Sequence, residues 1–204
     1  MPLPAPVASV TREALHTRSI TIQAFRRDDG LMDVEARLTD VKAHDFPLAS
    51  GTRPAGEAVH DMLVRITINR DYDVLEAVSA TDSMPYLGQC DRINADYRGL
   101  AGLNLKRGFR KAVLERFGEI RGCTHLTELI GLLPTAAIQA YAGERRENTN
   151  FKGKPFQLDR CHALDTRGPA VAQYYPTWHK KDEARTTVAR EVGAKADVAM
   201  DGKD

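Results

Sequence analysis

The chain has 204 residues, of which 42% are hydrophobic and 28% charged, an ordinary composition for a globular protein with one sizeable core. Lys and Arg number 29 against 28 Asp and Glu, so no net charge favours nucleic acid or a membrane surface as partner. No apolar run of about 18 residues could span a bilayer, and the first residues lack the pattern of a secretory signal. We therefore expect a cytoplasmic protein that binds neither nucleic acid nor membranes.

The first half of the chain carries strand signals. Alternating apolar and polar residues predict strands at 19–25, 31–41 and 60–68, with a partner strand at 74–80. Asp29-Gly30 predicts a tight hairpin between the first two strands, and Pro and Gly in 47–56 predict a loop. Together these elements predict an antiparallel meander. Asp33 and Glu35 share the face opposite the apolar one and could be general bases if that face lined a pocket, but exposure is the preferred interpretation. The same applies to Asp40.

Helical periodicity replaces alternation after Pro85. It predicts a short helix near 93–100 and a second near 109–117 that ends at Gly118. A third helix is predicted from about 124 to 141, with Pro134 as a kink or break; its apolar stripe comprises Leu126, Leu129, Ile130 and Leu133. Strands followed by helices predict an α+β fold, in which about four antiparallel strands carry about three helices on one face.

The last third of the chain looks irregular. Residues 148–179 contain several aromatic side chains without a clear period, which predicts an arm packed on the domain. One domain is therefore expected over 1–179. Residues 180–204 are polar and rich in alanine, which predicts a marginal helix or a disordered tail.

Three cysteines, Cys90, Cys123 and Cys161, form an odd and widely spaced set. A disulfide framework would need an even number and an oxidising compartment. Free buried thiols or metal ligands remain as interpretations.

Cys123 opens the third predicted helix in the segment Gly-Cys-Thr-His-Leu-Thr-Glu. The positive end of a helix dipole favours a thiolate, which is the form that binds metals. His125 follows two positions later, so both side chains could reach one ion. Alternatively, Cys123 is a small buried hydrophobic residue and His125 caps the helix or lies at the surface.

Two further stretches are expected near this helix start. His60 and Asp61 begin the third strand, and Cys90 follows the end of its antiparallel neighbour, so these positions should be close in space. A mixed Cys, His and Asp set suits Zn²⁺ or Fe²⁺ better than Mg²⁺ or Ca²⁺. We therefore predict one divalent metal ion, zinc rather than iron, bound by His60, Asp61, Cys90 and Cys123.

Two other groups of residues allow alternatives. Cys161 and His162 in the arm could complete the metal ligands, although a thiol tucked under the aromatic residues is the preferred interpretation. Arg26, in the charged first hairpin, belongs either to a solvated turn or to a site for a substrate anion. No phosphate loop, dinucleotide fingerprint, nucleophile elbow or HExxH helix is present, which argues against ATP, NAD and serine-hydrolase chemistry.

Several segments resemble a bacterial domain family of unknown function, DUF2889. They include Arg-Arg-Asp-Asp-Gly-Leu-Met-Asp from residue 26, Gly-Glu-Ala-Val-His-Asp-Met from residue 56 and Gly-Cys-Thr-His-Leu-Thr-Glu-Leu from residue 122. The resemblance covers about 14–178, and the Gly-Cys-Thr-His-Leu segment is its most specific part. Members of the family occur in bacteria that degrade aromatic compounds, which implies an aromatic substrate.

The order of elements is also similar to the NifU-type iron–sulfur scaffold, in which three Cys and an Asp hold a cluster or Zn²⁺. This similarity implies Asp61, Cys90 and Cys123 as ligands. The present chain differs because His60 stands near the position of the first scaffold cysteine, and because the Gly-rich cysteine segments are missing. A mononuclear metal at the same place is therefore favoured over cluster assembly.

These observations predict a metal-dependent enzyme of aromatic-compound catabolism. It would be a lyase that releases formaldehyde from a hydroxymethyl-bearing aromatic, or a hydrolase that uses activated water. His125 or Glu128 would move the proton, and Tyr86 and Arg26 would hold the aromatic ring. A non-enzymatic metal or iron–sulfur carrier with a protein partner, and a purely structural metal, are the alternatives. A homo-oligomer is compatible with the sequence.

Overall fold

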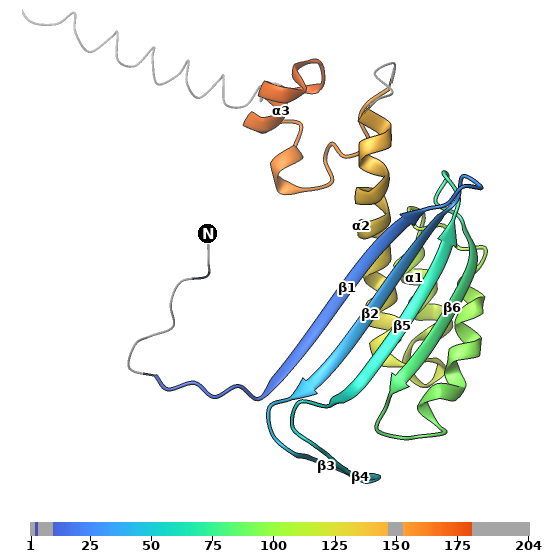
Figure 1. Cartoon of the computed structure of the whole chain (residues 1–204). Helices are drawn as coiled ribbons and strands as arrows, with labels where there is room; N and C mark the ends of the chain where they lie inside the picture. The colour runs from blue at the N-terminus through green and yellow to red at the C-terminus, as the bar shows by residue number, and fades with distance from the viewer. Residues whose placement is uncertain (1–2, 4–9, 147–152, 181–204) are drawn as a thin grey trace, which may run out of the picture. The chain divides into compact units, whose positions relative to one another are not determined.

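The computed structural model describes residue 3, residues 10–146 and residues 153–180 (Figure 1). The chain divides into two compact units, Met1–Arg145 and Arg146–Asp204. The predicted extents, one domain over 1–179 and a tail over 180–204, stay a prediction. Of the predicted tail, only Lys180 lies within the described residues.

The first unit is built on a four-stranded antiparallel sheet in the order β1-β2-β5-β6. Its strands are β1 (His16–Arg26), β2 (Met32–Lys42), β5 (Ala58–Ile68) and β6 (Val74–Ser83). Neighbours in the sheet follow one another in sequence apart from one small excursion, so the predicted meander and the α+β class are confirmed.

The excursion between β2 and β5 is a hairpin of its own. β3 (Phe46–Leu48) pairs with β4 (Gly51–Arg53) in a separate two-stranded sheet. The sequence predicted only a loop here. Gly51 adopts a φ of 124°, a conformation that glycine tolerates best, so the chain can reverse sharply enough for the two short strands to pair.

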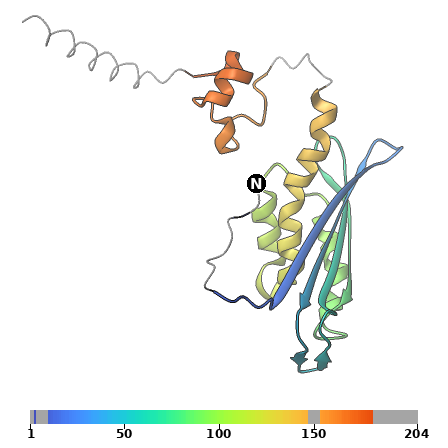
Figure 2. The same ribbon diagram turned by 60° about the vertical axis from the view of Figure 1, so that its left-hand side comes forward.

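Helices cover one face of the main sheet (Figures 1 and 2). They are the 3-10 helices η1 (Cys90–Leu100) and η2 (Glu119–Arg121) and the α-helices α1 (Phe109–Phe117) and α2 (Thr124–Arg146). Gly118 ends α1 as predicted. In contrast, α2 continues through Pro134, so the expectation of a break was wrong. The predicted stripe of α2 is fully buried, with Leu126, Leu129, Ile130 and Leu133 all at 0% exposure, and this packing holds the helix together.

The core lies between the sheet and these helices. Even-numbered residues of β2 and β5 point toward the helices and are at most 4% exposed; they are Met32, Val34, Ala36, Leu38, Met62, Val64, Ile66 and Ile68. Because side chains of a strand alternate between faces, the same face continues to Asp40 on β2 and His60 on β5. The apolar series thus leads directly to two polar residues at one end of the sheet.

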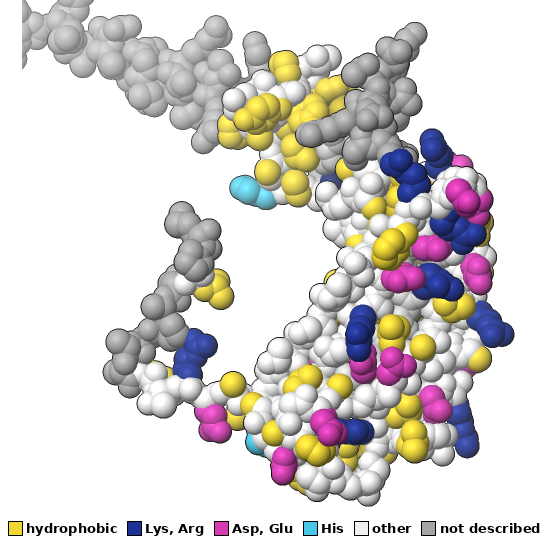
Figure 3. Space-filling view, viewed as in Figure 1, with side chains coloured by type: hydrophobic (Ala, Val, Ile, Leu, Met, Phe, Trp, Pro, Cys, Tyr) yellow, Lys and Arg dark blue, Asp and Glu magenta, His cyan; other side chains and the backbone are white. Residues whose placement is uncertain are grey.

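The opposite face of the sheet carries charged side chains of both signs (Figure 3). They include Glu35, Arg37, Asp61 and Arg65, which form cross-strand ion pairs there. Within the described residues, no helix is long and apolar enough to cross a membrane.

The second unit is described over residues 153–180. It contains three short helices, η3 (His162–Leu164), α3 (Pro169–Tyr174) and η4 (Pro176–Trp178), around the buried side chains of Leu158 and Val171. Asp159 accepts hydrogen bonds from Lys154, from the backbone N–H of Thr166 and from its hydroxyl. These bonds, that of Lys154 foremost, hold the pKa of Asp159 far below its ordinary value. The irregular character predicted for this region is correct; Phe151 lies outside the described residues.

Candidate metal centre

Three polar residues form a row across the first three strands of the sheet. In the register of the strands, Arg18 on β1 is opposite Asp40 on β2, and Asp40 is opposite His60 on β5. Directly opposite residues share a face, so all three point to the helix side. The register of β2 and β5 shifts immediately after Asp40. Such irregularities re-aim side chains at the ends of sheets.

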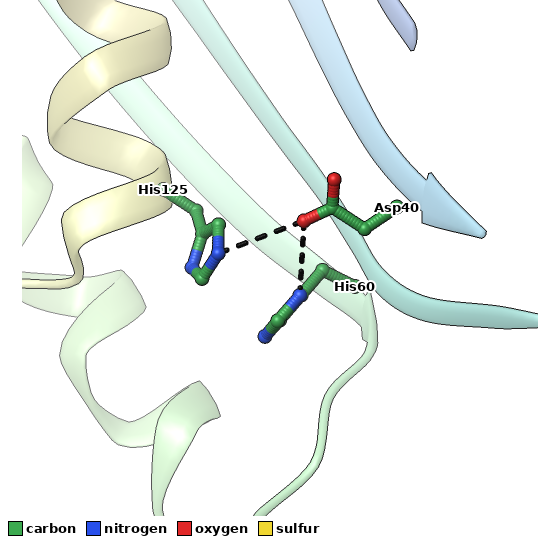
Figure 4. Close-up of side chains that lie close together, drawn as sticks. All are labelled: Asp40, His60 and His125. Atoms are coloured by element: carbon green, nitrogen blue, oxygen red, sulfur yellow. Dashed lines mark hydrogen bonds and ion pairs between the residues drawn. The ribbon is translucent and has the colours of Figure 1, made fainter. Parts of the chain in front are cut away.

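His125 joins this row from the first turn of α2 (Figure 4). Its Nε2 atom lies 3.6 Å from Oδ2 of Asp40, and Nδ1 of His60 lies 3.1 Å from the same oxygen. The two imidazole rings face each other with centroids 3.9 Å apart and planes tilted by 32°. One buried carboxylate oxygen is therefore shared by two histidines from different elements.

These spacings are close to those between ligands of a single metal ion. Atoms bonded to one ion at about 2.1 Å lie about 3.0–3.4 Å apart for octahedral or tetrahedral angles. One ligand atom each from Asp40, His60 and His125 lies within 4.8 Å of the others. Among the described residues, these three form the group of at least three His, Cys, Asp or Glu residues whose ligand atoms lie this close together. Two imidazoles and a carboxylate suit Zn²⁺ or Fe²⁺.

Asp40 is held by more groups than the two histidines. Its side chain is only 4% exposed, and Arg18 grips it with Nε 2.8 Å from Oδ1 and Nη2 2.9 Å from Oδ2. His16 Nε2 lies 3.1 Å from Oδ1. Burial alone would raise the pKa of Asp40, but the hydrogen bonds and charge of Arg18 outweigh it and lower the pKa. Asp40 is therefore an ionised carboxylate, as a metal ligand must be.

The two histidines are neutral for a related reason. Burial lowers the pKa of His60 and of His125 below the ordinary value. The charge of His125 lowers the pKa of His60 further, whereas Asp40 acts in the opposite direction on both. Neutral imidazole is the form that donates a lone pair to a metal, so the resting electrostatics favour binding.

Further residues support this cluster. Glu128, one helical turn beyond His125, accepts a hydrogen bond of 2.8 Å from Arg18 Nη1. Cys123 Sγ lies 3.9 Å from Nδ1 of His125 and 3.7 Å from the sulfur of Met62. With Nε2 of His125 facing Asp40, its Nδ1 faces the thiol. Contacts of that kind orient a histidine ligand. Cys123 thus lies beside a candidate ligand.

The structure brings together part of the predicted site. His60 and the start of α2 meet at one end of the sheet, as the sequence predicted, and His125 approaches Asp40 there. Asp61 does not, because consecutive residues of a strand point to opposite faces. Its carboxylate pairs instead with Arg37, at 2.8 Å from Nε and 2.5 Å from Nη2. Asp61 was therefore the wrong aspartate to group with His60.

The remaining cysteines are not gathered at this point. Cys90 begins η1 and is half-buried, and in residues 10–146 neither Cys90 nor Cys123 belongs to a group of three ligand atoms. Cys161 and His162 are exposed in the second unit. The preferred interpretation of Cys161 as a thiol covered by aromatic residues was therefore wrong.

The residues predicted to hold a substrate ring lie at different distances from the cluster. Tyr86 follows β6 at the same end of the sheet, and its side chain is 57% exposed. Arg26 ends β1 eight residues beyond Arg18, which corresponds to about 26 Å along a strand. Arg26 is therefore too distant to contact a small substrate at this cluster.

Sequence reasoning missed Asp40, Arg18 and His16. Asp40 was expected to be exposed, but it is 3% exposed, and the available signal was its position next in the buried series that ends at Leu38. Arg18 and His16 were overlooked because the first strand begins at residue 16 and not at 19. A polar residue that continues the alternating series of buried apolar residues in a strand is the pattern that would have indicated this cluster.

The fold and the cluster together define an α+β protein with a two-histidine, one-carboxylate centre. The family described as "Protein of unknown function (DUF2889)" matches residues 16–139, a segment that contains Asp40, His60 and His125. The chain belongs to this family. Comparisons with curated proteins and with solved structures gave no match, so the suggested similarity to the NifU-type scaffold stays a prediction.

Proposed function

We propose that the protein is a metal-dependent enzyme that acts on a small organic substrate, with Asp40, His60 and His125 as ligands of one divalent ion. The observation that carries the proposal is the spacing of the ligand atoms, 3.1 Å and 3.6 Å around one oxygen of Asp40. Three protein ligands leave further coordination positions open, which is typical of catalytic sites and not of closed structural ones.

The degree of exposure supports a catalytic site over a structural one. The side chains of His60 and His125 are 17% and 24% exposed, so part of each imidazole is open to solvent. An iron–sulfur carrier, the alternative function, would need several thiolates. The candidate group in the described residues contains two imidazoles and a carboxylate, which favours the enzyme.

A divalent ion at this place would act as a Lewis acid toward a substrate hydroxyl or carbonyl group or toward water. The chain itself supplies the other components. Arg18 is one-third exposed and can place positive charge next to a substrate oxygen. Glu128, 56% exposed and bonded to Arg18, takes the role of proton carrier, because His125 is assigned to the metal.

For the reaction we retain a lyase that releases formaldehyde from a hydroxymethyl-bearing aromatic, with a hydrolase as the second choice. In the lyase reaction the hydroxyl proton passes to a base, the C–O bond becomes a carbonyl and the adjacent C–C bond breaks. The electron pair of that bond remains on the carbon left behind, which then takes a proton, so R–CH₂OH gives R–H and formaldehyde. The aromatic substrate rests on the family resemblance.

Metal analysis of the purified full-length chain tests the premise. We expect about one equivalent of zinc or iron per chain by elemental analysis, and loss of that metal in Asp40→Asn. Wild-type protein that neither retains nor takes up a divalent metal would refute the proposal.

Turnover of a hydroxymethyl-substituted phenolic compound tests the reaction. Wild-type protein should release one formaldehyde per substrate consumed, and both chelation and Asp40→Asn should stop the release. Water-dependent cleavage of an ester or amide without formaldehyde would favour the hydrolase. Activity that survives complete metal removal would rule out both metal-dependent reactions.

A further inference from the structure

The start of α2, which carries His125, is fixed by a buried tyrosine from another helix. Tyr97 on η1 is 0% exposed. Its hydroxyl accepts a hydrogen bond of 2.8 Å from the N–H of Cys123. The same hydroxyl lies 3.1 Å from the carbonyl oxygen of Cys123 and 3.2 Å from Oγ1 of Thr127, and it donates its proton to one of them.

Tyr97 thus satisfies a backbone donor at the start of α2 from outside the helix. The first N–H groups of an α-helix have no partner within the helix, and a Ser, Thr, Asp or Asn side chain commonly satisfies one of them. Here Cys123 precedes α2, and its own side chain faces Met62 and His125. The phenol hydroxyl supplies the contact from outside the helix, and Thr127 extends it by donating to the carbonyl oxygen of Phe117 at 3.1 Å.

The packing at Gly122 leaves little freedom in this arrangement. A Cβ atom at Gly122 would lie 2.3 Å from the carbonyl oxygen of Phe117 and 2.9 Å from the hydroxyl of Tyr97. The ring of Tyr97 stacks on that of Phe117 with centroids 4.7 Å apart. The backbone before α2 is therefore pressed against the tyrosine and cannot shift toward it.

From these contacts we infer that Tyr97 is a positioning residue of the metal centre, acting through the first turn of α2 on His125. The inference rests on the proposed metal site. His125 is only two residues beyond Cys123, so a small rotation of this turn moves its Nε2 atom away from Asp40. Functional constellations generally tolerate displacements of only about 0.5 Å.

The test compares two tyrosine-to-phenylalanine variants in the full-length chain. Tyr97→Phe keeps the ring and removes the hydroxyl, while Tyr72→Phe is a matched control, since Tyr72 is also buried, at 1% exposure, but lies beyond the far end of β5. Residues that orient a ligand typically contribute about 10–100-fold to metal affinity. We expect Tyr97→Phe to weaken Zn²⁺ and Co²⁺ binding by about tenfold or more and to alter the visible absorption of bound Co²⁺. Tyr72→Phe should change neither.

A double-mutant cycle shows whether the effect passes through His125. In a His125→Ala background, Tyr97→Phe should cause no further loss of Co²⁺ affinity. An equal loss in both backgrounds, or wild-type affinity in Tyr97→Phe, would overturn the inference while leaving the metal site intact.

If Tyr97→Phe does not fold, Thr127→Val removes the next hydroxyl of the same chain of hydrogen bonds, and an unchanged Co²⁺ affinity in that variant would overturn the inference. If wild-type protein binds neither Zn²⁺ nor Co²⁺, the proposed function and this inference both fail.

Discussion

Two buried aspartates occupy almost the same height on opposite faces of the sheet. Asp40 faces the helices and Asp61 faces away, and each is gripped through both oxygens by an arginine of the neighbouring strand, Arg18 or Arg37. Their side chains are 4% and 11% exposed. By charge, burial and arginine partner the two carboxylates are nearly equivalent.

The difference lies in what else reaches each carboxylate. Three histidines, His16, His60 and His125, come within 3.6 Å of Asp40, whereas Asp61 forms its ion pair with Arg37. An arginine pair by itself accounts for a structural carboxylate in a sheet. At Asp40, by contrast, two imidazoles with lowered pKa values, His60 and His125, face one carboxylate oxygen, an arrangement that suits a set of metal ligands. This difference favours the helix-side face of the sheet as the location of the candidate site.

The largest expected effect separates the two aspartates directly. Asp40→Asn removes a charged ligand and should weaken Zn²⁺ binding by at least about 100-fold, more than the change of a supporting residue costs. Asp61→Asn should leave the affinity within about twofold of wild type, since its carboxylate points away from the histidines. Calorimetric titration of metal-free protein measures both. A comparable loss in the two variants would remove the distinction between the faces.

Substitution of the two arginine partners, Arg18 and Arg37, should give a smaller difference in Zn²⁺ affinity. A lysine keeps the charge but loses the two-pronged hydrogen bond that fixes a carboxylate. We expect Arg18→Lys to weaken Zn²⁺ binding by about tenfold, and Arg37→Lys to have no effect. If Arg18→Lys instead binds the metal more tightly, then Arg18 competes with the ion for Asp40 and does not orient it.

Lowering the pH should weaken metal binding through His60 and His125, which lie on the helix side of the sheet. Protons compete with metal for imidazole nitrogen, so affinity falls as the pH drops through the histidine pKa. Because burial lowers the pKa of His60 and His125, the Zn²⁺ affinity should hold from pH 8 to about 6.5, the ordinary histidine value, and fall only in more acidic solution. A fall that is already complete at pH 6.5 would contradict the lowered pKa values.

The same shifts predict the stability of the metal-free protein. Below about pH 6.5 the unfolded chain binds protons on these histidines while the folded chain still resists them. The melting temperature of chelator-treated protein should therefore decrease as the pH is lowered from 6.5, and His125→Gln should reduce that decrease. A melting temperature independent of pH in this range would mean that the two imidazoles titrate alike in both states.

The smallest effect is expected at the cysteines that the sequence suggested as ligands. Cys90→Ala should leave Zn²⁺ affinity within about twofold of wild type. Cys123→Ala removes only a thiol that lies 3.9 Å from His125, a weak supporting contact, and should cost no more than about tenfold. Loss of stoichiometric metal in either variant would restore the thiolate ligands and displace Asp40.

Much of the fold could be predicted because its signals are local. Alternation located the main strands, and the apolar stripe of Leu126, Leu129, Ile130 and Leu133 located α2. His60 and His125 could be placed at one end of the sheet because strand order and helix position follow from these elements. Pro134 does not break α2 because burial of the surrounding stripe outweighs the loss of one backbone hydrogen bond.

The rest of the site could be predicted only from the alternation of strand residues between the two faces and from the exact ends of the strands. Asp40 and Asp61 are both polar residues near strand ends, and only the alternation counted from Leu38 or Met62 shows which one shares a face with His60. Arg18 and His16 extend β1 beyond its apolar core, where no hydrophobic signal marks the strand. Cysteines have metal-binding chemistry, but no sequence pattern determines the direction of their side chains.

The β3–β4 excursion leaves the sheet just after Asp40 and returns just before His60. Val41 is paired with Ala58 at its base, and the backbone N–H of Gly56 donates to the carbonyl oxygen of Lys42 at 3.0 Å, so this neck is closed by strand pairing on either side of the two ligands. Changes in the length or composition of the excursion can therefore alter the surroundings of the candidate site while Asp40 and His60 stay fixed on the paired strands. Divergence in substrate preference among relatives should accumulate in this segment.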